Sequence, residues 1–464
     1  MTTRRAFLAG GAALASSTAV PVAAWAGAQG KTVLEAKEGT AQIAPAGYAR
    51  TAIWGYDGGV PGPEIRLRQG DRLQRTFLNG LPQPSTVHWH GLRIDNAMDG
   101  VPGLTQQAVQ PGQTFDYSFT APDAGTYWYH AHERSTEQVA RGLYGPLIVE
   151  EPEQPDVDRE EVLVLDDWLL NPETAQLDPD YMARHDRSHA GRRGNLIVTN
   201  GRYDLSIPAR RHERLRLRLI NAANARIFEL GLAGFEGWVL AEDGMPLAAP
   251  RKIAGTFLLG PGQRMDLFVD VVAEAGDMAH LVHVVDGEGL AQVSFPVQRD
   301  NSRTRRAPPT ALPANPAMEI SGLEAAQKAR LHMEGGAMGR LQTAVLDGKE
   351  RTFRQLVQAN QFWSFNGTVG MTDTPLVAVD KGRAVRLEIF NDTVFPHAMH
   401  LHGMHFREVM TDGQFGPLRD TLLMIGGQNR EIAFMADNPG DWLFHCHMLG
   451  HAASGMMTWV RVAA

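Results

Sequence analysis

The chain has 464 residues, 48 glycines, 27 prolines, one cysteine and a formal net charge of −8. This length exceeds what one compact core holds, so we expect two or three domains. The acidic balance argues against nucleic acid or an anionic membrane surface as a partner. Short Val, Ile, Leu, Phe and Tyr runs between glycine and proline turns predict an all-β protein.

Residues 1–28 have the features of a twin-arginine signal peptide. Arg4 and Arg5 precede an apolar run, and a small-residue cleavage site comes next, after Ala26 or Ala28. The apolar run is too short to anchor the chain in a membrane. We therefore predict a periplasmic protein that the twin-arginine export machinery delivers, with no membrane anchor.

A pattern of glycine, alternating strand and asparagine occurs three times along the chain. Each copy predicts a half-buried strand that enters a turn. The copies are Gly70 to Asn79, a middle segment that ends at Asn221, and Gly382 to Asn391.

The three copies differ in the residues after the asparagine. Nine and eleven residues later, the first and third copies carry an H-x-H pair, whereas the middle copy carries two leucines that we expect in its core. These positions are His88 and His90, His400 and His402, and Leu230 and Leu232.

A second H-x-H pair completes each terminal repeat. His130 follows Gly125 by five residues, and His445 follows Gly440 by the same interval; His132 and His447 complete these pairs. In the middle repeat, His280 and His283 lie near the corresponding place, but their register slips, and we interpret both as surface histidines.

Both histidines of an H-x-H pair face the same side of a strand. Four pairs supply eight imidazoles, four from each end of the chain. If the two terminal domains pack together, all eight imidazoles can meet in one interface. A single domain could not supply that many imidazoles.

The single cysteine lies inside the last H-x-H pair. A secreted protein with one cysteine cannot use it for an internal disulfide, and a buried inert thiol is the simplest alternative. However, His451 follows Cys446 by five residues, Met456 follows it by ten, and His397 precedes the third H-x-H pair. One thiolate, two imidazoles and a weak thioether suit type 1 copper, whereas zinc prefers tetrahedral N/S ligands without a thioether. The remaining histidines are assigned to surface or packing roles: His185, His189, His212, His280, His283, His332 and His405.

With these motifs, the chain resembles a three-domain bacterial multicopper oxidase of the laccase-like or cuprous oxidase-like kind. The resemblance covers nearly the whole mature sequence and implies an all-β fold of three cupredoxin-like Greek-key β-barrels. The expected divisions are domain 1 at 29–152, a copper-free domain 2 at 153–300, a linker with a short helix at 301–350, and domain 3 at 351–464.

The resemblance also implies four copper ions and their ligands. Type 1 copper would take His397, Cys446 and His451, with Met456 axial. Type 2 copper would take His88 and His400. One type 3 copper would take His90, His130 and His447, and its partner would take His132, His402 and His445. An electron donor would then be oxidised at the type 1 copper, and Cys446 would pass electrons through His445 and His447 to the trinuclear cluster, where O2 is reduced to water.

Asp99, nine residues after His90, matches the acid that the family places near the type 2 copper. We interpret it as a proton relay to the cluster, with a purely structural role in the turn before Gly100 as the alternative. Many relatives carry an acid after the residue matched by His451, but this chain has Ala452. Either the second proton donor lies elsewhere in the chain, or cleavage of the O–O bond is slower.

The electron donor is the most open question. The segment 301–350 holds only three thioethers, Met318, Met333 and Met338, and includes "LEAAQKARLHME", for which we predict a short helix. Our first choice is an open, shallow type 1 face for phenols or aromatic amines. A metal-ion donor, Cu(I) or Mn(II), is second, with Met399, Met404 and Met410 as receiving thioethers if they do not serve in packing. Non-catalytic alternatives, a structural protein or a copper store, would not need the complete ligand set, and a copper nitrite reductase would not need eight paired imidazoles.

Overall fold

The computed structural model describes residues 32–299 and 304–464. The predicted signal peptide lies outside this range. The larger sheets fall into three pairs, and each pair is formed by one continuous stretch of chain. The all-β prediction is therefore confirmed. No helix in the described part of the chain is long and apolar enough to cross a bilayer.

The first sheet pair has the strand orders β2-β1-β4-β6 and β3-β8-β7-β5. Its elements are β1 (Thr32–Ala41), β2 (Thr51–Tyr56), β3 (Ile65–Arg68), β4 (Arg72–Asn79), β5 (Val87–His90), the 3-10 turn η1 (Asn96–Met98), β6 (Thr114–Thr120), β7 (Gly125–Ala131), α2 (Ser135–Ala140) and β8 (Tyr144–Glu150).

The second pair has the orders β10-β9-β12-β17-β14-β15 and β11-β19-β18-β13-β16. Its elements are β9 (Arg159–Trp168), α3 (Arg184–Ser188), β10 (Leu196–Thr199), β11 (Ala209–Arg210), β12 (Arg214–Asn221), β13 (Phe228–Ala233), β14 (Phe235–Glu242), β15 (Met245–Lys252), β16 (Phe257–Leu259), β17 (Arg264–Val271), β18 (Met278–Val285) and β19 (Glu288–Gln298).

The third pair has the orders β23-β20-β25-β30-β27-β28 and β24-β32-β31-β26-β29, with a small β21-β22 hairpin beside them. Its elements are η2 (Leu323–Ala325), β20 (Gln327–Gly335), β21 (Thr343–Leu346), β22 (Lys349–Thr352), α4 (Phe353–Gln358), β23 (Trp363–Phe365), β24 (Val377–Asp380), β25 (Ala384–Asn391), β26 (His397–Leu401), β27 (Phe406–Val409), β28 (Phe415–Arg419), β29 (Thr421–Met424), β30 (Asn429–Met435), β31 (Gly440–Cys446), α5 (Leu449–Ala452) and β32 (Met457–Ala463).

The short helix predicted in the 301–350 linker is wrong. Apart from the single turn η2, the segment "QKARLHMEG" forms the strand β20, which pairs in parallel with β25. Leu331 and Met333 are buried while their neighbours are half-exposed, which is the period of two of a strand. Tertiary pairing thus overrides the helical propensity of Leu, Glu, Ala and Lys, and the third sheet pair begins inside the expected linker.

The repeated asparagine makes the same contacts in all three sheet pairs. Each Nδ2 donates to two backbone carbonyls, and each Oδ1 accepts the N–H of the residue two positions later. This network fixes the turn that leads into the next strand, so the count from the asparagine to the later side chains is the same in each copy. The three residues, all fully buried, are Asn79, Asn221 and Asn391.

The strand register is also repeated. His88 lies opposite His130, and His400 lies opposite His445. In the second pair, Leu230 lies opposite His283, so His283 is the structural counterpart of His130 and His445. The interpretation of His283 as a surface residue is therefore wrong: its side chain is buried and packs against the ring of Phe228. Its register matches when it is counted along β18 from Met278, a position held by glycine in the other two copies.

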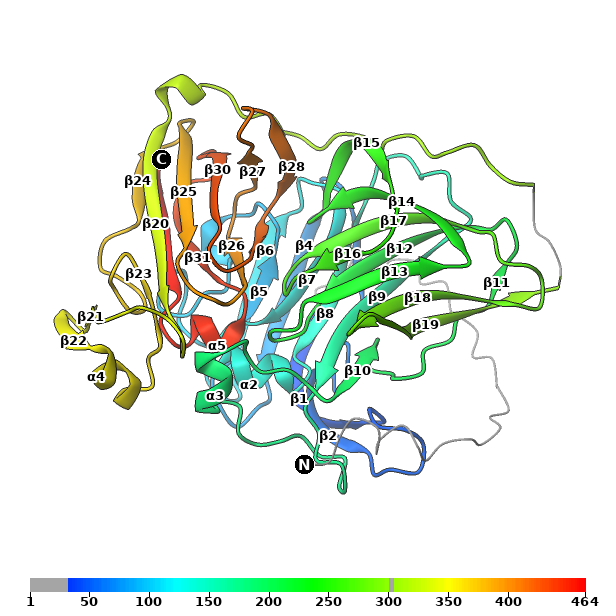
Figure 1. The fold of residues 1–464 in the computed structure, drawn as a ribbon, viewed down its shortest axis with the longest axis horizontal. Coiled ribbons are helices and arrows are strands. Elements are labelled where there is room, and N and C mark those ends of the chain that lie inside the picture. The colour runs from blue at the N-terminus through cyan, green and yellow to red at the C-terminus, as the bar shows by residue number, and fades with distance from the viewer. Residues whose placement is uncertain (1–31, 300–303) are drawn as a thin grey trace.

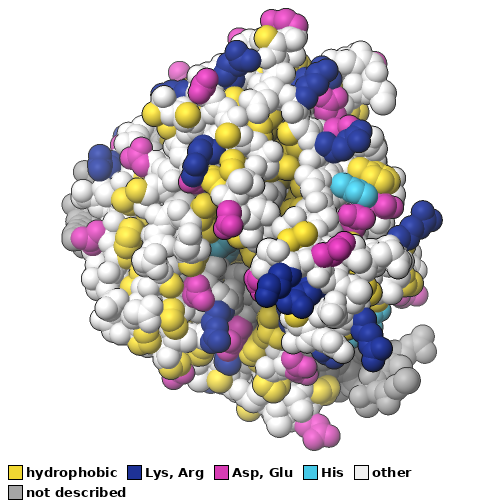
Figure 2. Space-filling view, turned by 90° about the vertical axis from the view of Figure 1, so that its left-hand side faces the viewer, with side chains coloured by type: hydrophobic (Ala, Val, Ile, Leu, Met, Phe, Trp, Pro, Cys, Tyr) yellow, Lys and Arg dark blue, Asp and Glu magenta, His cyan; other side chains and the backbone are white. Residues whose placement is uncertain are grey.

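Each sheet pair has its own apolar core. Figure 1 shows the second pair at the right, the third at the left and the first behind and between them. The second pair packs a row of buried arginines against the first: Arg216 binds Glu151, and Arg218 donates to Thr126 Oγ1. On the face viewed in Figure 2, basic and acidic side chains are interspersed without a large patch of either sign.

Candidate metal centres

Eight histidines of the four H-x-H pairs come together between the first and third sheet pairs, as the sequence predicted. They lie on or directly after β5, β7, β26 and β31, and all are buried except the half-buried His132. The rings of His88 and His402 stack with centroids 3.9 Å apart, and those of His90 and His400 stack at 3.7 Å. Imidazoles from opposite ends of the chain therefore share one buried cluster.

Most of these imidazoles donate their outer N–H to an oxygen, which leaves a lone pair on the other nitrogen. Backbone carbonyls accept from the Nδ1 of His88, His130, His400 and His445, and carboxylates accept from His402 Nδ1 and His90 Nε2. Burial holds the pKa of His90, His130, His402, His445 and His447 well below 6.5, and neighbouring imidazoles add to the effect.

The inward nitrogens of His402 and His445 show what this arrangement needs. Their Nε2 atoms are 3.1 Å apart, although both rings donate from Nδ1. Two lone pairs at this distance repel each other unless a cation lies between them. Other ring nitrogens of the cluster have no hydrogen-bond partner among the described residues. They are His88 Nε2, His90 Nδ1, His130 Nε2, His400 Nε2 and both nitrogens of His447.

A second, smaller cluster contains the cysteine. Cys446 Sγ lies 3.5 Å from His397 Nδ1 and 3.9 Å from His451 Nδ1, and the two Nδ1 atoms are 3.1 Å apart. His397 Nε2 donates to Thr393 Oγ1 and His451 Nε2 donates to the carbonyl of His189, so both Nδ1 atoms carry lone pairs. These three donors converge on one point, as the sequence predicted.

Burial raises the pKa of the Cys446 thiol to about 12, so the metal-free thiol stays protonated and a metal must displace its proton. Met456 is fully buried in the same core, and its carbonyl accepts the Cys446 N–H. Soft thiolate with imidazoles suits copper, and neutral inward imidazoles suit the same metal in the larger cluster. The residues of both clusters therefore fit copper ions.

Cys446 links the two clusters covalently. It is bonded through the backbone to His445, which is fixed in β31, and to His447, whose N–H donates to the carbonyl of Ala398 in β26. The thiol faces the small cluster while both neighbouring imidazoles face the large one, because side chains alternate along a strand. This alternation explains why one cysteine stands between two histidines.

Asp99 contacts two of the clustered histidines. Its carbonyl accepts from His88 Nδ1 at 2.8 Å, and its carboxylate Oδ2 accepts from His402 Nδ1 at 2.9 Å. The residue lies just after η1 and is buried. It therefore orients one imidazole of each terminal sheet pair and adds a carboxylate at the edge of the cluster.

Asp420, which the sequence patterns did not reveal, has the matching place on the other side. Its Oδ1 accepts from His90 Nε2 at 3.2 Å, and its carbonyl accepts from His400 Nδ1 at 3.1 Å. Asp420 has no H-x-H motif nearby, and the only sequence signal was a charged residue between two apolar strands. Its fully buried carboxylate marks it as functional only once the fold is known.

The second sheet pair holds Asp420 in place through Arg264. The guanidinium donates to both Asp420 oxygens, at 2.9 and 2.6 Å, and to the carbonyl of Thr126 in the first pair. Burial opposes ionisation of Asp420, but Arg264 keeps its pKa well below the usual range. Asp243 accepts from the Arg264 and Thr421 backbone N–H groups, and burial with the nearby Asp420 charge raises its pKa to about 7. Asp243 and Arg264 line a cavity of about 230 Å³ between the second and third pairs.

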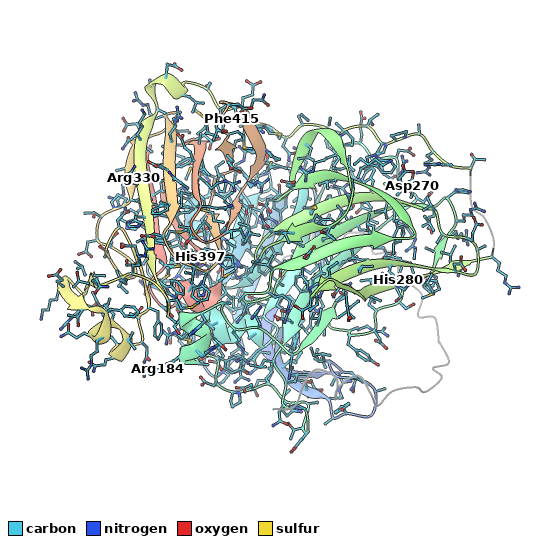
Figure 3. The ribbon with its side chains drawn as sticks, viewed as in Figure 1. Arg184, Asp270, His280, Arg330, His397 and Phe415 are labelled. Atoms are coloured by element: carbon cyan, nitrogen blue, oxygen red, sulfur yellow. The ribbon has the colours of Figure 1, made fainter. Side chains whose placement is uncertain are left out.

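The small cluster is covered, which corrects the expectation of an open type 1 face. His451 is fully buried, and the loop after α3 lies over its Nε2. Arg187 anchors α3 there by donating to Ser454 Oγ, and the Trp363 indole donates to the Arg187 carbonyl. Figure 3 shows His397 beside α5 in the interior, with Arg184 of α3 below it at the outer surface.

The other predictions for single residues have mixed outcomes. Met399 and Met404 are buried core residues, which favours packing, whereas Met410 is exposed. His405, assigned to an ordinary role, is buried near Asp420. Leu230 is buried in the second core and Leu232 packs against it.

The comparisons with known proteins agree with this chemistry. Family profiles described as multicopper oxidase match residues 37–154 and 347–464. The multicopper oxidase MmcO of Mycobacterium tuberculosis is 31% identical and covers 98% of this chain and 95% of its own.

Two solved structures are similar over 93% of the chain. A multi-copper oxidase from Pseudomonas thermotolerans has a TM-score of 0.80 at 34% identity, with 99% of its own chain covered. Lac15 from a marine microbial metagenome has a TM-score of 0.76 at 42% identity, with all of its chain covered.

The metal-free protein should lose stability in acid. Unfolded histidine has a pKa near 6.5, whereas burial lowers the pKa of His132 to about 3 and that of His451 to about 4. Below about pH 6.5 the unfolded chain binds more protons, so each such histidine costs about 1.4 kcal/mol per pH unit until its folded pKa is reached. Urea unfolding midpoints of metal-free protein should fall steadily from pH 7 to pH 5. A midpoint that stays constant over this range would contradict the burial of neutral imidazoles.

Arg264→Gln should weaken copper retention. The substitution removes the cation that holds the Asp420 carboxylate, so Asp420 no longer orients His90 and His400. Loss of a residue that orients a metal ligand costs about 10–100-fold in metal affinity. The measurement is copper retained per folded chain after dialysis against a chelator. Arg216→Gln is the matched control, because Arg216 is equally buried and paired with Glu151 and Asp266. Both variants should lose stability, about 3–5 kcal/mol each, but only Arg264→Gln should lose copper. Equal copper retention in the two variants would refute this role of Arg264.

Proposed function

The chain belongs to the multicopper oxidase family, and from this premise we propose that it couples four one-electron oxidations at a type 1 copper to the reduction of O2 to two waters at a trinuclear cluster. The family makes the protein an oxidoreductase that uses O2 and contains copper. The observation that carries the finer proposal is the placement of the Cys446 thiol and ten imidazoles in two clusters joined through the backbone.

The proposed ligand sets are those that the family resemblance implies. In two of them the donor atoms lie within 4.8 Å of one another: His397 with Cys446 and His451, and His132 with His402 and His445. The first would hold type 1 copper, with the Met456 thioether as a further donor, and the second would hold one type 3 copper. The other sets are His90, His130 and His447 for the second type 3 copper, and His88 with His400 for type 2 copper; inward nitrogens without partners on five of these histidines support them.

Bound copper would supply the one-electron redox chemistry that no side chain of this chain provides. The protein's part is to position and to insulate. Carbonyl and carboxylate acceptors fix most of the imidazoles, so these ligands need no rearrangement when a metal changes its charge. Burial keeps bulk water from the large cluster, and the Cys446 backbone gives a short bonded connection between the two clusters.

Asp99 is the proposed proton carrier for O2 reduction. Its carboxylate lies 2.9 Å from His402 Nδ1 and 3.3 Å from His88 Nδ1, at the edge of the large cluster. A carboxylate held there can deliver protons to oxygen as it is reduced. Many relatives carry a second acid at the position of Ala452. Because Ala452 has no carboxylate, Asp99 would carry a larger share of the proton transfer in this chain.

The donor proposed first is a phenol or an aromatic amine. A specific observation favours the second candidate, a metal ion: His451 is covered by the loop after α3, so a ring cannot contact the His451 edge directly. We also propose export by the twin-arginine pathway to the periplasm, which rests on Arg4, Arg5 and the apolar run after them.

The function is tested by oxygen uptake of copper-loaded protein with a methoxyphenol, Cu(I) and Mn(II) in parallel. Uptake with at least one donor is expected, together with an intense blue absorption from the thiolate and Cu(II). Cys446→Ser should lose the blue band and nearly all uptake while retaining the copper of the large cluster. A wild type that binds four coppers and is colourless would overturn the type 1 assignment.

Asp99→Asn should separate proton transfer from positioning. The Asn amide oxygen can still accept from His402, but the amide cannot carry a proton, so kcat for oxygen uptake should fall by about 10²-fold or more. The blue band should remain. Asp123→Asn is a matched control, because Asp123 is equally buried but paired with Arg93 away from the clusters. An unchanged kcat in Asp99→Asn would reduce Asp99 to an orienting residue.

A further inference from the structure

We propose that Asp243 takes up protons from a cavity that opens to solvent between the second and third sheet pairs, and supplies them for the reduction of O2 at the large cluster. This inference rests on the proposed function and names a second source of protons, which Ala452 cannot provide. Asp243 lies in the turn between β14 and β15, and it belongs to neither of the two clusters.

The first observation is the cavity, which lies where β14 and β15 meet β28 (Figure 1). Its volume is about 230 Å³, and its lining includes Asp243, Arg251 and Leu258. The Arg251 side chain is 51% exposed and Leu258 is 48% exposed, whereas Asp243 is buried. Solvent that enters beside Arg251 can therefore reach the Asp243 carboxyl group, since a cavity of this size has room for several waters.

The second observation is the connection from Asp243 to the large cluster through Arg264. Arg264 Nη1 lies 3.5 Å from Asp243 Oδ1 and 2.9 Å from Asp420 Oδ1. One guanidinium thus lies between two buried carboxyl groups. Asp420 in turn accepts from His90 Nε2 at 3.2 Å. Asp243 is therefore linked to a ligand candidate through two intervening side chains.

Thr421 also lies between the two carboxyl groups. Its backbone N–H donates to Asp243 Oδ2 at 3.1 Å, and its hydroxyl donates to Asp420 Oδ1 at 2.7 Å. The same hydroxyl oxygen lies 3.1 Å from His400 Nδ1. Asp243, Thr421 and Asp420 therefore form a polar row that leads from the cavity to the imidazoles, instead of apolar core that would block a proton.

The charges around Asp243 favour a proton on it near neutral pH. Arg264 can compensate only one of the two carboxylates that it contacts, and burial penalises a carboxylate that has no cation of its own. Arg264 donates to both oxygens of Asp420, so Asp243 is the one left uncompensated. Burial first, and the Asp420 charge second, raise the pKa of Asp243 to about 7.

The other charged groups that face Asp243 do not remove this effect. Glu242 of β14 accepts from Arg251 of β15 and from Arg419 of β28, so two cations and one carboxylate lie at this side of the cavity. Arg419 lowers the pKa of Asp243, but by less than burial raises it. Tyr127 of β7 faces the same turn and stays neutral, because burial raises its pKa well above the usual value.

The proposed step balances in protons and electrons. An electron that enters the large cluster adds negative charge there, which raises the proton affinity of Asp243. The Asp243 carboxylate then takes a proton from water in the cavity, and this O–H bond breaks again when oxygen is reduced. The donor supplies four electrons for each O2, solvent supplies four protons, and two waters form.

The test measures proton uptake on reduction. Copper-loaded protein is reduced under argon with hexaammineruthenium(II), which releases no protons when it is oxidised, and a pH indicator in weak buffer records the protons bound. Asp243→Asn should bind about one proton fewer than the wild type near neutral pH while it keeps its copper and its blue band. Asp123→Asn is the matched control, equally buried and paired with Arg93, and should bind as many protons as the wild type. Equal proton uptake in the two variants would overturn the proposal.

Arg419→Gln tests the same site with Asp243 unaltered, so it decides the question if Asp243→Asn does not fold or does not retain copper. Removal of this cation raises the pKa of Asp243, so the midpoint of proton uptake should move to higher pH. A midpoint that stays constant or falls would contradict the proposal. A wild type that takes up no oxygen with any donor would refute the proposed function. A wild type that oxidises a donor, with both variants binding protons as it does, would refute only the role of Asp243.

Discussion

The structure depends on neutral imidazoles that are buried with their lone pairs facing each other. Such nitrogens are costly to bury without partners, and the 3.1 Å separation of His402 and His445 Nε2 is repulsive on its own. The cost is offset only when cations lie between the rings, so the same contacts that destabilise the metal-free interface select for metal. Backbone carbonyls and two carboxylates around the cluster accept the outer N–H groups of six of its imidazoles, which leaves their inner nitrogens free to bind metal.

The second sheet pair takes part in this arrangement although it has no H-x-H pair. Arg264 fixes the carboxylate that orients His90 and His400, and it contacts all three sheet pairs at once. The packing is close: a side chain at Gly262, whose φ is +83°, would lie 2.9 Å from His447. The middle unit is therefore a wall of the large cluster as well as a spacer, and its loop after α3 also covers the small one.

The sequence reached most of the site because the repeat carries it. Asn79, Asn221 and Asn391 fix the same turn in each unit, so counting from them found four of the eight histidines. Counting from Gly125 and Gly440 found the other four, with the cysteine inside the last pair. The same counting failed for His283, because its strand has no glycine to count from, and the helical composition of the segment before Gly335 hid the strand β20. Asp420 and Arg264 carried no spacing signal, since their meaning lies in a contact between residues 156 positions apart.

The sequence by itself determined the all-β class, the donor atoms and their pairing in twos, because alternation along a strand and repeat spacing are local properties. Tertiary structure decided which nitrogen of each imidazole is free, which acids orient them, and whether the small cluster is open. Those properties depend on how three sheet pairs pack, and burial and hydrogen bonding across their interfaces have no counterpart in local sequence. The covered His451 is the clearest case.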